Sequence, residues 1–311
     1  MRSAFHFEGL VWDWPIAVYL FLIGISAGLV MVAIMLRRGL PEAGEPQSPV
    51  MRATLWVAPL SVILGLLILI FHLTRPWAFW KLMFHYSLTS VMSMGVMLFQ
   101  IYMLTLAAWL AVVFRAPLNA LVRRWLPPLL PAVALLERFQ RWLRPLEHLM
   151  LGLALLLGAY TGFLLSVLTS RPMLNHPVLP ALFLFSGLSS GLAVAMLAAA
   201  RERHARTLHW LHGLEMPILA MEIFLLVAFF AGLWLGDDGK VRAFGAALGG
   251  GFWSAWFWWG VVGLGFVAPI LARWAIRRRP GLQVAIACGC SLVGVLMLRF
   301  YILYAGQMTL A

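Results

Sequence analysis

Long apolar segments alternate with short polar segments along the whole chain, and the polar segments are rich in arginine. None of the apolar segments alternates apolar and polar residues with a period of two, which excludes the strands of an outer-membrane barrel. Each is long enough to cross a hydrocarbon layer about 30 Å thick as a helix. The pattern therefore predicts an all-α polytopic membrane protein with eight transmembrane helices. Their approximate limits are 15–36, 53–72, 87–113, 147–169, 178–200, 215–235, 252–272 and 283–305.

The composition excludes a soluble protein. Hydrophobic residues make up 63% of the sequence, charged residues make up 11%, and the mean hydropathy is +0.93. Soluble domains carry about 25% charged residues, so this protein lacks the polar surface that water requires. The net charge of +12 does not indicate nucleic acid, because the basic residues cluster between apolar segments, where they encode membrane topology. The expected surroundings are membrane lipid.

The distribution of basic residues predicts the orientation. Alternate connections hold sixteen Lys and Arg residues on one side of the membrane and six on the other. By the positive-inside rule, the side with sixteen faces the cytoplasm. With eight spans, both termini then lie on the periplasmic side of the cytoplasmic (inner) membrane.

A short motif occurs twice and predicts how the helices are grouped. Gly24–Leu29 in the first segment (GISAGL) is echoed by Gly187–Leu192 in the fifth (GLSSGL). Four helices separate the copies, which predicts two parallel four-helix bundles, residues 1–173 and 174–311. The alternative is two independent motifs of small residues that let helices pack closely.

The residues that could hold a redox cofactor are poorly placed. A membrane haem needs axial ligands inside the helices, yet only His72 and His148 touch a predicted span, and they lie at opposite ends. The two cysteines, Cys288 and Cys290, are too few for an iron–sulfur cluster, and their spacing without nearby partners is a poor metal site. We expect no haem, no iron–sulfur cluster and no metal in this protein.

Several polar and phenolic groups share the outer boundary of the predicted helices. Ionisable groups are costly inside a membrane and are candidates for function. Tyr and Trp also form interfacial belts, and a long Arg can extend to the headgroups, so an anchoring role is the alternative for most of them. Tyr160 is the exception, because it lies too far from the end of segment 147–169 for such a belt. The candidates are Asp13, Tyr19, His72, Arg75, Tyr160 and Arg299.

Two carboxyl groups lie in the inner half of the sixth segment. Glu215 and Glu222 are seven residues apart, so they share one face of a helix. A buried Glu222 must be protonated or paired. It either belongs to a proton path from the cytoplasm or is a neutral carboxyl bonded to a neighbouring helix.

These groups suggest a polar, aromatic-lined pocket near the outer surface, suited to an amphipathic ligand with a lipid tail, such as a quinone. A small-solute transporter is the competing class, although transporters place their sites near the midplane. A passive membrane anchor is a further alternative.

Four segments resemble the NrfD/PsrC family, the membrane subunits of polysulfide reductases and of the formate-dependent cytochrome c nitrite reductase pathway. The resemblance runs over all eight predicted helices. The segments are Phe5–Pro15, Phe71–Trp77, Leu157–Phe163 and Leu298–Gln307.

The resemblance implies a menaquinol dehydrogenase subunit without haem. Such a subunit passes electrons to a periplasmic ferredoxin-like iron–sulfur partner with four clusters. Multihaem cytochromes c then reduce nitrite to ammonium. A related subunit that serves another respiratory reductase, for polysulfide, tetrathionate or a similar acceptor, is the nearest alternative.

The resemblance also implies roles for particular residues. The quinone-binding Tyr of the family falls on Tyr160. In the polysulfide reductase branch an Asn and a His of the first helix also touch the quinone, and these positions are Ile16 and Tyr19 here. Tyr19 is a replacement donor, whereas Ile16 cannot donate. We expect the quinol head group to lie against Tyr160 and Tyr19, with His72 and Arg75 nearby and Glu222 taking part in proton transfer.

Overall fold

The structure is a computed structural model. It describes residues 4–7, 9–73, 75–84, 86–87, 89–125, 128, 130–202, 204–275 and 279–309. Every regular element in these ranges is a helix, as the sequence predicts.

The described residues hold eight helices that are long and apolar enough to cross a membrane, which confirms the predicted number of spans. The fourth span runs over Leu136–Ser166 and ends in α7 (Leu143–Ser166). The seventh, Phe252–Ala275, joins α11 (Phe252–Ala255), the π-helix η5 (Trp256–Val267) and α12 (Ala268–Ala275). The other spans are α1 (Trp14–Gly39), α2 (Pro49–His72), α4 (Val91–Val113), α8 (Leu179–Arg201), α9 (Ala205–Trp234) and α13 (Pro280–Gln307).

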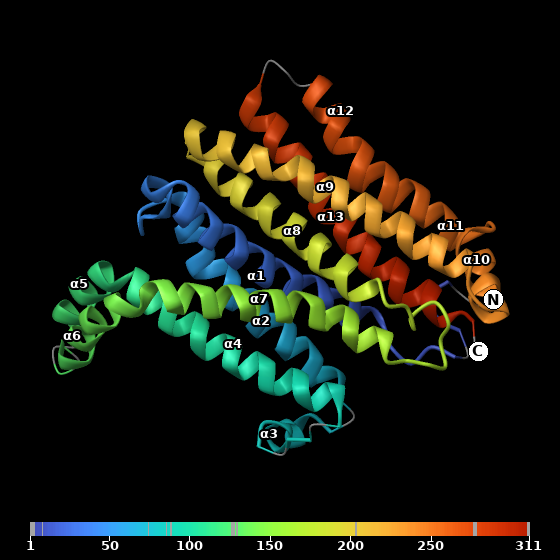
Figure 1. Ribbon diagram of the computed structural model, residues 1–311, viewed down its shortest axis with the longest axis horizontal. Helices are drawn as coiled ribbons and strands as arrows, with labels where there is room; N and C mark the ends of the chain where they lie inside the picture. Colours follow the sequence, from blue (N-terminus) through green and yellow to red (C-terminus); the bar gives the residue numbers. More distant parts are fainter. Residues whose placement is uncertain are drawn as a thin grey trace.

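Short helices occupy the connections. The longest connection, between α4 and α7, folds into α5 (Arg115–Trp125), α6 (Leu130–Phe139) and η4 (Gln140–Trp142). At the opposite end of the molecule α10 follows α9 (Figure 1). The remaining short helices are η1 (Pro41–Gly44), η2 (Pro76–Ala78), α3 (Phe79–Leu82) and α10 (Asp238–Leu248).

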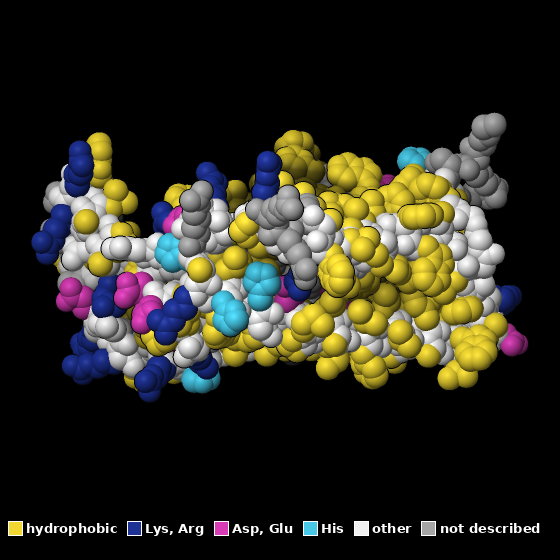
Figure 2. All heavy atoms as spheres, turned by 90° about the horizontal axis from the view of Figure 1, so that it is seen from above, with side chains coloured by type: hydrophobic (Ala, Val, Ile, Leu, Met, Phe, Trp, Pro, Cys, Tyr) yellow, Lys and Arg dark blue, Asp and Glu magenta, His cyan; other side chains and the backbone are white. Residues whose placement is uncertain are grey.

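The two ends of the bundle differ in character. Lys and Arg side chains gather at the end formed by α5 and α6, and a broad hydrophobic surface covers much of the rest of the visible face (Figure 2). We call this the basic end. Both termini lie at the opposite end, which we call the terminal end (Figure 1). Four basic residues of the predicted charge count, Arg2, Arg203, Arg277 and Arg278, lie outside the described residues.

The two copies of the small-residue motif pack against each other. Helix α1 packs more extensively on α8 than on any other helix. A Cβ atom at Gly28 would overlap the backbone of Gly187, and one at Gly191 would overlap the backbone of Gly28. The two copies of the motif therefore form a single site at which α1 and α8 cross closely, because small residues let the two backbones approach each other. This interface joins the two predicted halves, whose boundary at 173/174 stays a prediction.

A clamp of polar side chains ties the two ends of the sequence together at the terminal end. The Gln307 side-chain oxygen accepts hydrogen bonds from the backbone N–H groups of Val11 (2.9 Å) and Trp12 (3.0 Å). Its amide nitrogen donates to the Trp12 carbonyl at 3.0 Å. Arg171, from the α7–α8 connection, donates to the carbonyls of Gly9 and Gln307. The sequence alone does not indicate this clamp.

His176, in the same connection, is buried and neutral. Burial, and secondarily the nearby Lys240 ammonium, lowers the pKa of His176 from 6.5 to about 4. Its ring packs edge-on against Phe229 at 4.9 Å, and its Nδ1 accepts a hydrogen bond from the Val178 N–H at 3.2 Å. These contacts give it a role in packing the connection onto α9.

Candidate functional site

The phenolic pair that the sequence singles out is brought together by α4. The Phe99 ring of α4 stands perpendicular to the Tyr160 ring of α7 at 6.0 Å between centroids. The same ring lies 6.1 Å from the Tyr19 ring of α1. Tyr19 is 1% exposed and Tyr160 is 8% exposed. We call these three residues the phenolic cluster.

Tyr160 lies close to the terminal end of its helix. Its hydroxyl donates to the carbonyl of Val91, the first residue of α4, at 3.3 Å. Helix α7 ends at Ser166, earlier than segment 147–169 predicts. Tyr160 therefore lies six residues from the end of its helix, and the expectation that it lies too deep for an interfacial tyrosine stays a prediction. The contacts of the Tyr160 hydroxyl are the structural observation that bears on whether this residue binds a ligand or anchors the helix.

A glycine of α4 makes room for Tyr160. A Cβ atom at Gly95 would overlap the Tyr160 ring and hydroxyl, so only glycine lets the ring lie this close to the α4 backbone. On the next turns of α4, Tyr102 is completely buried and its hydroxyl lies 2.9 Å from that of Ser26 on α1. The sequence analysis did not single out Gly95 or Tyr102. Gly95 and Tyr102 are seven residues apart and so share one face of α4, and this spacing could have indicated that they line the same interface.

His72 and Arg75 are at the terminal end but are not part of the phenolic cluster. His72 is the last residue of α2, and both side chains are exposed. Within the described part of the protein, neither forms a hydrogen bond or an ion pair with Tyr19 or Tyr160. They lie on the rim of the molecule, where a bound head group or a partner protein could reach them.

Asp13 lies on the α13 side of the first helix. It occupies the N-cap position of α1, is half-buried, and its carboxyl does not cap the helix. It lies near enough to Tyr304 of α13 to interact electrostatically with that hydroxyl. Tyr304 in turn stacks on Trp253 at 5.3 Å. Asp13 thus belongs to the surroundings of the clamp.

Arg299 is buried between helices and does not extend to the membrane surface. Its side chain is 0% exposed. It donates to the Phe183 carbonyl of α8 at 3.0 Å, and the guanidinium lies over the Phe183 ring at 3.7 Å from the centroid. The anchoring alternative, in which Arg299 reaches the headgroups, is therefore excluded. Its electrostatic partner is Glu222 of α9.

Glu222 is buried, as predicted, but its neighbours belong to other helices than those of the phenolic cluster. It is 2% exposed and interacts with Ser189 of α8 and with Arg299. Glu215, two turns away, forms an ion pair with Arg273 of α12. The predicted site residues therefore form two separate groups: a phenolic cluster and a carboxyl–arginine group.

The described residues contain no group of three or more His, Cys, Asp or Glu side chains that could hold a metal ion. Cys288 and Cys290 are free thiols. The expectation that this protein holds no haem and no iron–sulfur cluster stays a prediction.

Fold and composition together define a multi-pass helical membrane protein with a buried phenolic cluster nearer the terminal end of its helices. The family model for polysulphide reductase, NrfD, matches residues 2–311, and the protein belongs to this family. It is 63% identical to protein NrfD of Escherichia coli over 99% of both sequences. It is 46% identical to the protein NrfD homolog of Haemophilus influenzae, over 99% of this sequence and 98% of that one. It is 38% identical to the C subunit of the Wolinella succinogenes polysulfide reductase, over 97% of this sequence and 96% of that one.

Membership of this family establishes the general function of the protein. Its members are membrane subunits of respiratory reductases that interact with quinones, which fits a quinol as substrate. Related proteins belong to multi-subunit reductases, which implies catalytic partner subunits.

Proposed function

We propose that this protein is a menaquinol-oxidising subunit of the inner membrane. In this proposal it passes electrons to a periplasmic ferredoxin-like iron–sulfur subunit with four clusters, and multihaem cytochromes c then reduce nitrite to ammonium. The identity of 63% to protein NrfD of Escherichia coli supports this branch of the family over the others. The phenolic cluster supports the position of the quinol.

The observation that carries the proposal is the hydroxyl of Tyr160. It donates to the Val91 carbonyl across 3.3 Å, longer than a typical O–H···O bond of about 2.7–2.8 Å. Because this hydrogen bond is long, replacing it by a hydrogen bond to a quinone oxygen costs little free energy. The Val91 carbonyl belongs to the first turn of α4 and follows the exposed residues Thr89 and Ser90, where water can reach it.

The residues of this protein position the quinol and receive its protons. Oxidation of the quinol itself releases two electrons and two protons, and the partner subunit takes the electrons. The Tyr160 hydroxyl donates to one head-group oxygen. Tyr19, on the far side of the Phe99 ring, bounds the space where the head group lies. His72 and Arg75 are exposed near the end of α2, where the His72 imidazole can receive a proton and the Arg75 guanidinium can steer the head group.

The partner subunit would dock at the terminal end. Polar side chains of the α7–α8 connection and of α10 line a cavity of about 330 Å³ there. Its lining includes Asp237, Asp238, Lys240 and Arg242, so it offers both signs of charge to a protein surface.

Replacing Tyr160 by phenylalanine tests the site. Losing one hydrogen bond to a neutral ligand costs about 0.5–1.5 kcal/mol, which is roughly a two- to tenfold loss of quinol affinity. A larger fall in turnover would show that the hydroxyl also transfers a proton. The measurement is quinol-dependent reduction of the iron–sulfur partner by the intact complex. Tyr86→Phe, which removes an exposed hydroxyl bonded to Met83 and Gln100, is the control. Equal kinetics for the two variants would place the quinol elsewhere.

Reporter fusions test the proposed topology. The clamp holds both terminal segments at one end of the bundle. The positive-inside rule places the basic end in the cytoplasm. A C-terminal alkaline phosphatase fusion should therefore be active, and a fusion within the α5–α6 connection should be inactive. The reverse pattern would contradict the assignment.

Composition of the purified complex distinguishes the alternative functions. Co-purification with an iron–sulfur subunit supports a redox role, and the identity of the terminal enzyme separates nitrite reduction from polysulfide or tetrathionate reduction. Purification without any redox partner would instead favour a membrane anchor or a small-solute transporter.

A further inference from the structure

Two adjoining cavities lie in the second half of the bundle, away from the phenolic cluster. The larger, of about 50 Å³, opens between α8, α9, α12 and α13. The smaller, of about 20 Å³, continues from it to Glu222. The two share lining residues, including Ser189 and Ser291. A water molecule needs about 10–15 Å³, so the larger cavity has room for several waters and the smaller one for a single water.

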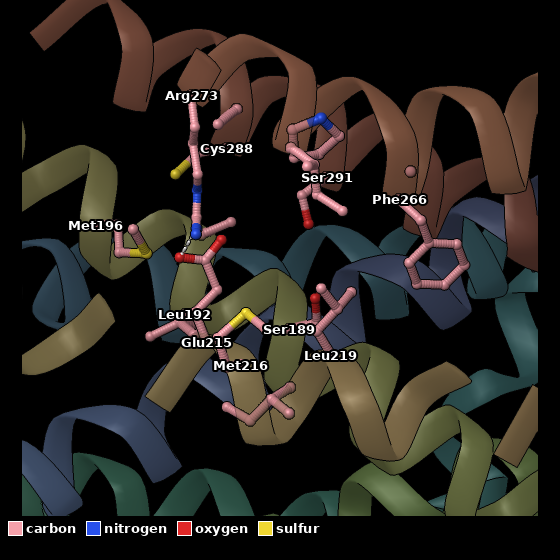
Figure 3. A pocket seen from close by; sticks show the side chains of 16 residues that line it. Ser189, Leu192, Met196, Glu215, Met216, Leu219, Phe266, Arg273, Cys288 and Ser291 are labelled. Atoms are coloured by element: carbon pink, nitrogen blue, oxygen red, sulfur yellow. Dashed lines mark ion pairs between the residues drawn. The ribbon is translucent and has the colours of Figure 1, made fainter. Parts of the chain in front are cut away.

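The mouth of these cavities carries an ion pair. Glu215 and Arg273 line the larger cavity, and their side chains are 23% and 31% exposed. Figure 3 shows Arg273 reaching down to the Glu215 carboxyl at one side of the cavity. Glu215 lies in the first half of α9, which begins after the α8–α9 connection at the basic end. The mouth therefore lies in the half of α9 nearer the basic end.

Hydroxyl groups connect the mouth to the interior. The side chains of Ser189 on α8 and Ser291 on α13 point toward one another across the cavity (Figure 3). Both also line the smaller cavity, and Ser189 interacts with the Glu222 carboxyl. A hydroxyl can donate and accept at the same time, so these two groups can relay a proton between waters.

The inner end is a buried charge centre. Glu222 faces Arg299, which is fully buried. Among the described residues, Arg299 Nε and Nη1 have no hydrogen-bond partner. A guanidinium has five N–H donors, and burial without partners is costly, so polar groups or water next to it are strongly favoured.

We propose that the two cavities form a hydrated proton path from the basic end to Glu222. The Glu215–Arg273 pair is its entrance, and Ser189 and Ser291 bridge its two parts. A proton passes from bulk water through this series of waters and hydroxyls to the Glu222 carboxylate, which becomes a carboxylic acid, and it returns by the same route. No electron moves. The path lies on other helices than Tyr160 and Tyr19, so it stands independently of the quinol site.

Among the described residues, few titratable or charged side chains face this path. Helix α9 contributes Glu215 and Glu222, and α12 contributes Arg273. Helix α13 contributes Cys288 and Arg299.

Infrared spectroscopy of the protein in lipid vesicles tests the path without quinol. The carboxylic-acid C=O band of Glu222 is identified by its loss in Glu222→Gln. We expect this band to follow the bulk pH and to shift promptly when the buffer is changed to D₂O. Ser291→Val removes one bridging hydroxyl and fills cavity space while leaving Glu222 and Arg299 in place. It should slow the exchange by about 100-fold or more, since positioned proton-transfer groups contribute about 10²–10⁴-fold.

Glu147→Gln is the matched control. Glu147 is also a buried carboxyl, ion-paired with Arg37 at 2.9 Å, but it lines neither cavity. Its substitution should leave the Glu222 band and its exchange unchanged. The proposal is overturned if no band lost in Glu222→Gln follows pH or exchanges with D₂O, or if Ser291→Val exchanges as fast as the unsubstituted protein. Should Glu222→Gln fail to insert, the exchanging acid band and its slowing in Ser291→Val decide the question.

Discussion

Replacing Gly191 by leucine should prevent α1 and α8 from packing and should sharply reduce the amount of folded protein in the membrane. A Cβ atom at Gly191 would overlap backbone atoms of Gly28 and Leu29, and backbone cannot move aside as a flexible side chain can. Overpacking costs about 1–3 kcal/mol even in adaptable cores, and this contact lies at the most extensive helix interface of the bundle. The measurement is the yield and thermal midpoint of the purified protein.

A second glycine provides the control for this substitution. A Cβ atom at Gly152 on α7 would meet nothing within 4 Å. Gly152→Leu makes the same chemical change in a spanning helix and should leave yield and thermal midpoint nearly unchanged. Equal losses for both variants would mean that added bulk in any helix is harmful, and the α1–α8 crossing would not be the cause.

Replacing Arg299 by methionine should destabilise the protein by about 3–5 kcal/mol, because removing one partner leaves the other buried charge uncompensated. Methionine keeps the apolar stem that packs on Phe183, so the loss reports on the charge. The double variant Arg299→Met/Glu222→Gln removes both charges and should recover part of the loss, with a coupling of about 0.5–3 kcal/mol. Thermal unfolding of the three variants measures this.

Exposed Arg138 gives the control for the charge change. Arg138→Met should shift the thermal midpoint little, because exposed charges contribute little to stability. If Arg299→Met costs no more than Arg138→Met, or if the double variant is as unstable as the sum of its parts, Glu222 and Arg299 do not act as a pair.

The spans could be predicted because each needs only length and apolar composition, and these are local properties. What the pattern could not show is the kind of helix. Trp256–Val267 adopts π-helical hydrogen bonding. A segment that is apolar on every face has no periodicity from which the number of residues per turn could be read. The paired glycine motifs were visible, but their direct contact with each other depends on how the two halves assemble.

The end of the bundle at which Tyr19, Tyr160 and Arg299 lie was predictable from the sequence, and which of them lie together was predictable only in part. Counting residues along a helix placed Tyr19, Tyr160 and Arg299 in the same half of the membrane. Rotation about the helix axis decides which of them meet, and it separates Arg299 from the two tyrosines. Phe99 of α4 contacts both tyrosines because α4 packs along α7, which itself packs on α1. A single sequence does not show how each helix is rotated about its axis relative to its neighbours.

The clamp between the two ends of the sequence has a consequence for synthesis. The acceptor of the backbone N–H groups of Val11 and Trp12 is Gln307, which is synthesised 295 residues after Trp12. Helix α1 likewise lacks its main packing surface until α8 has been inserted. Helix α1 must therefore remain in contact with lipid or with the insertion machinery until α8 and α13 have been inserted. In a polypeptide that stops before α13, the N–H groups of Val11 and Trp12 would lack this acceptor. The segment before α1 would then be accessible to membrane proteases.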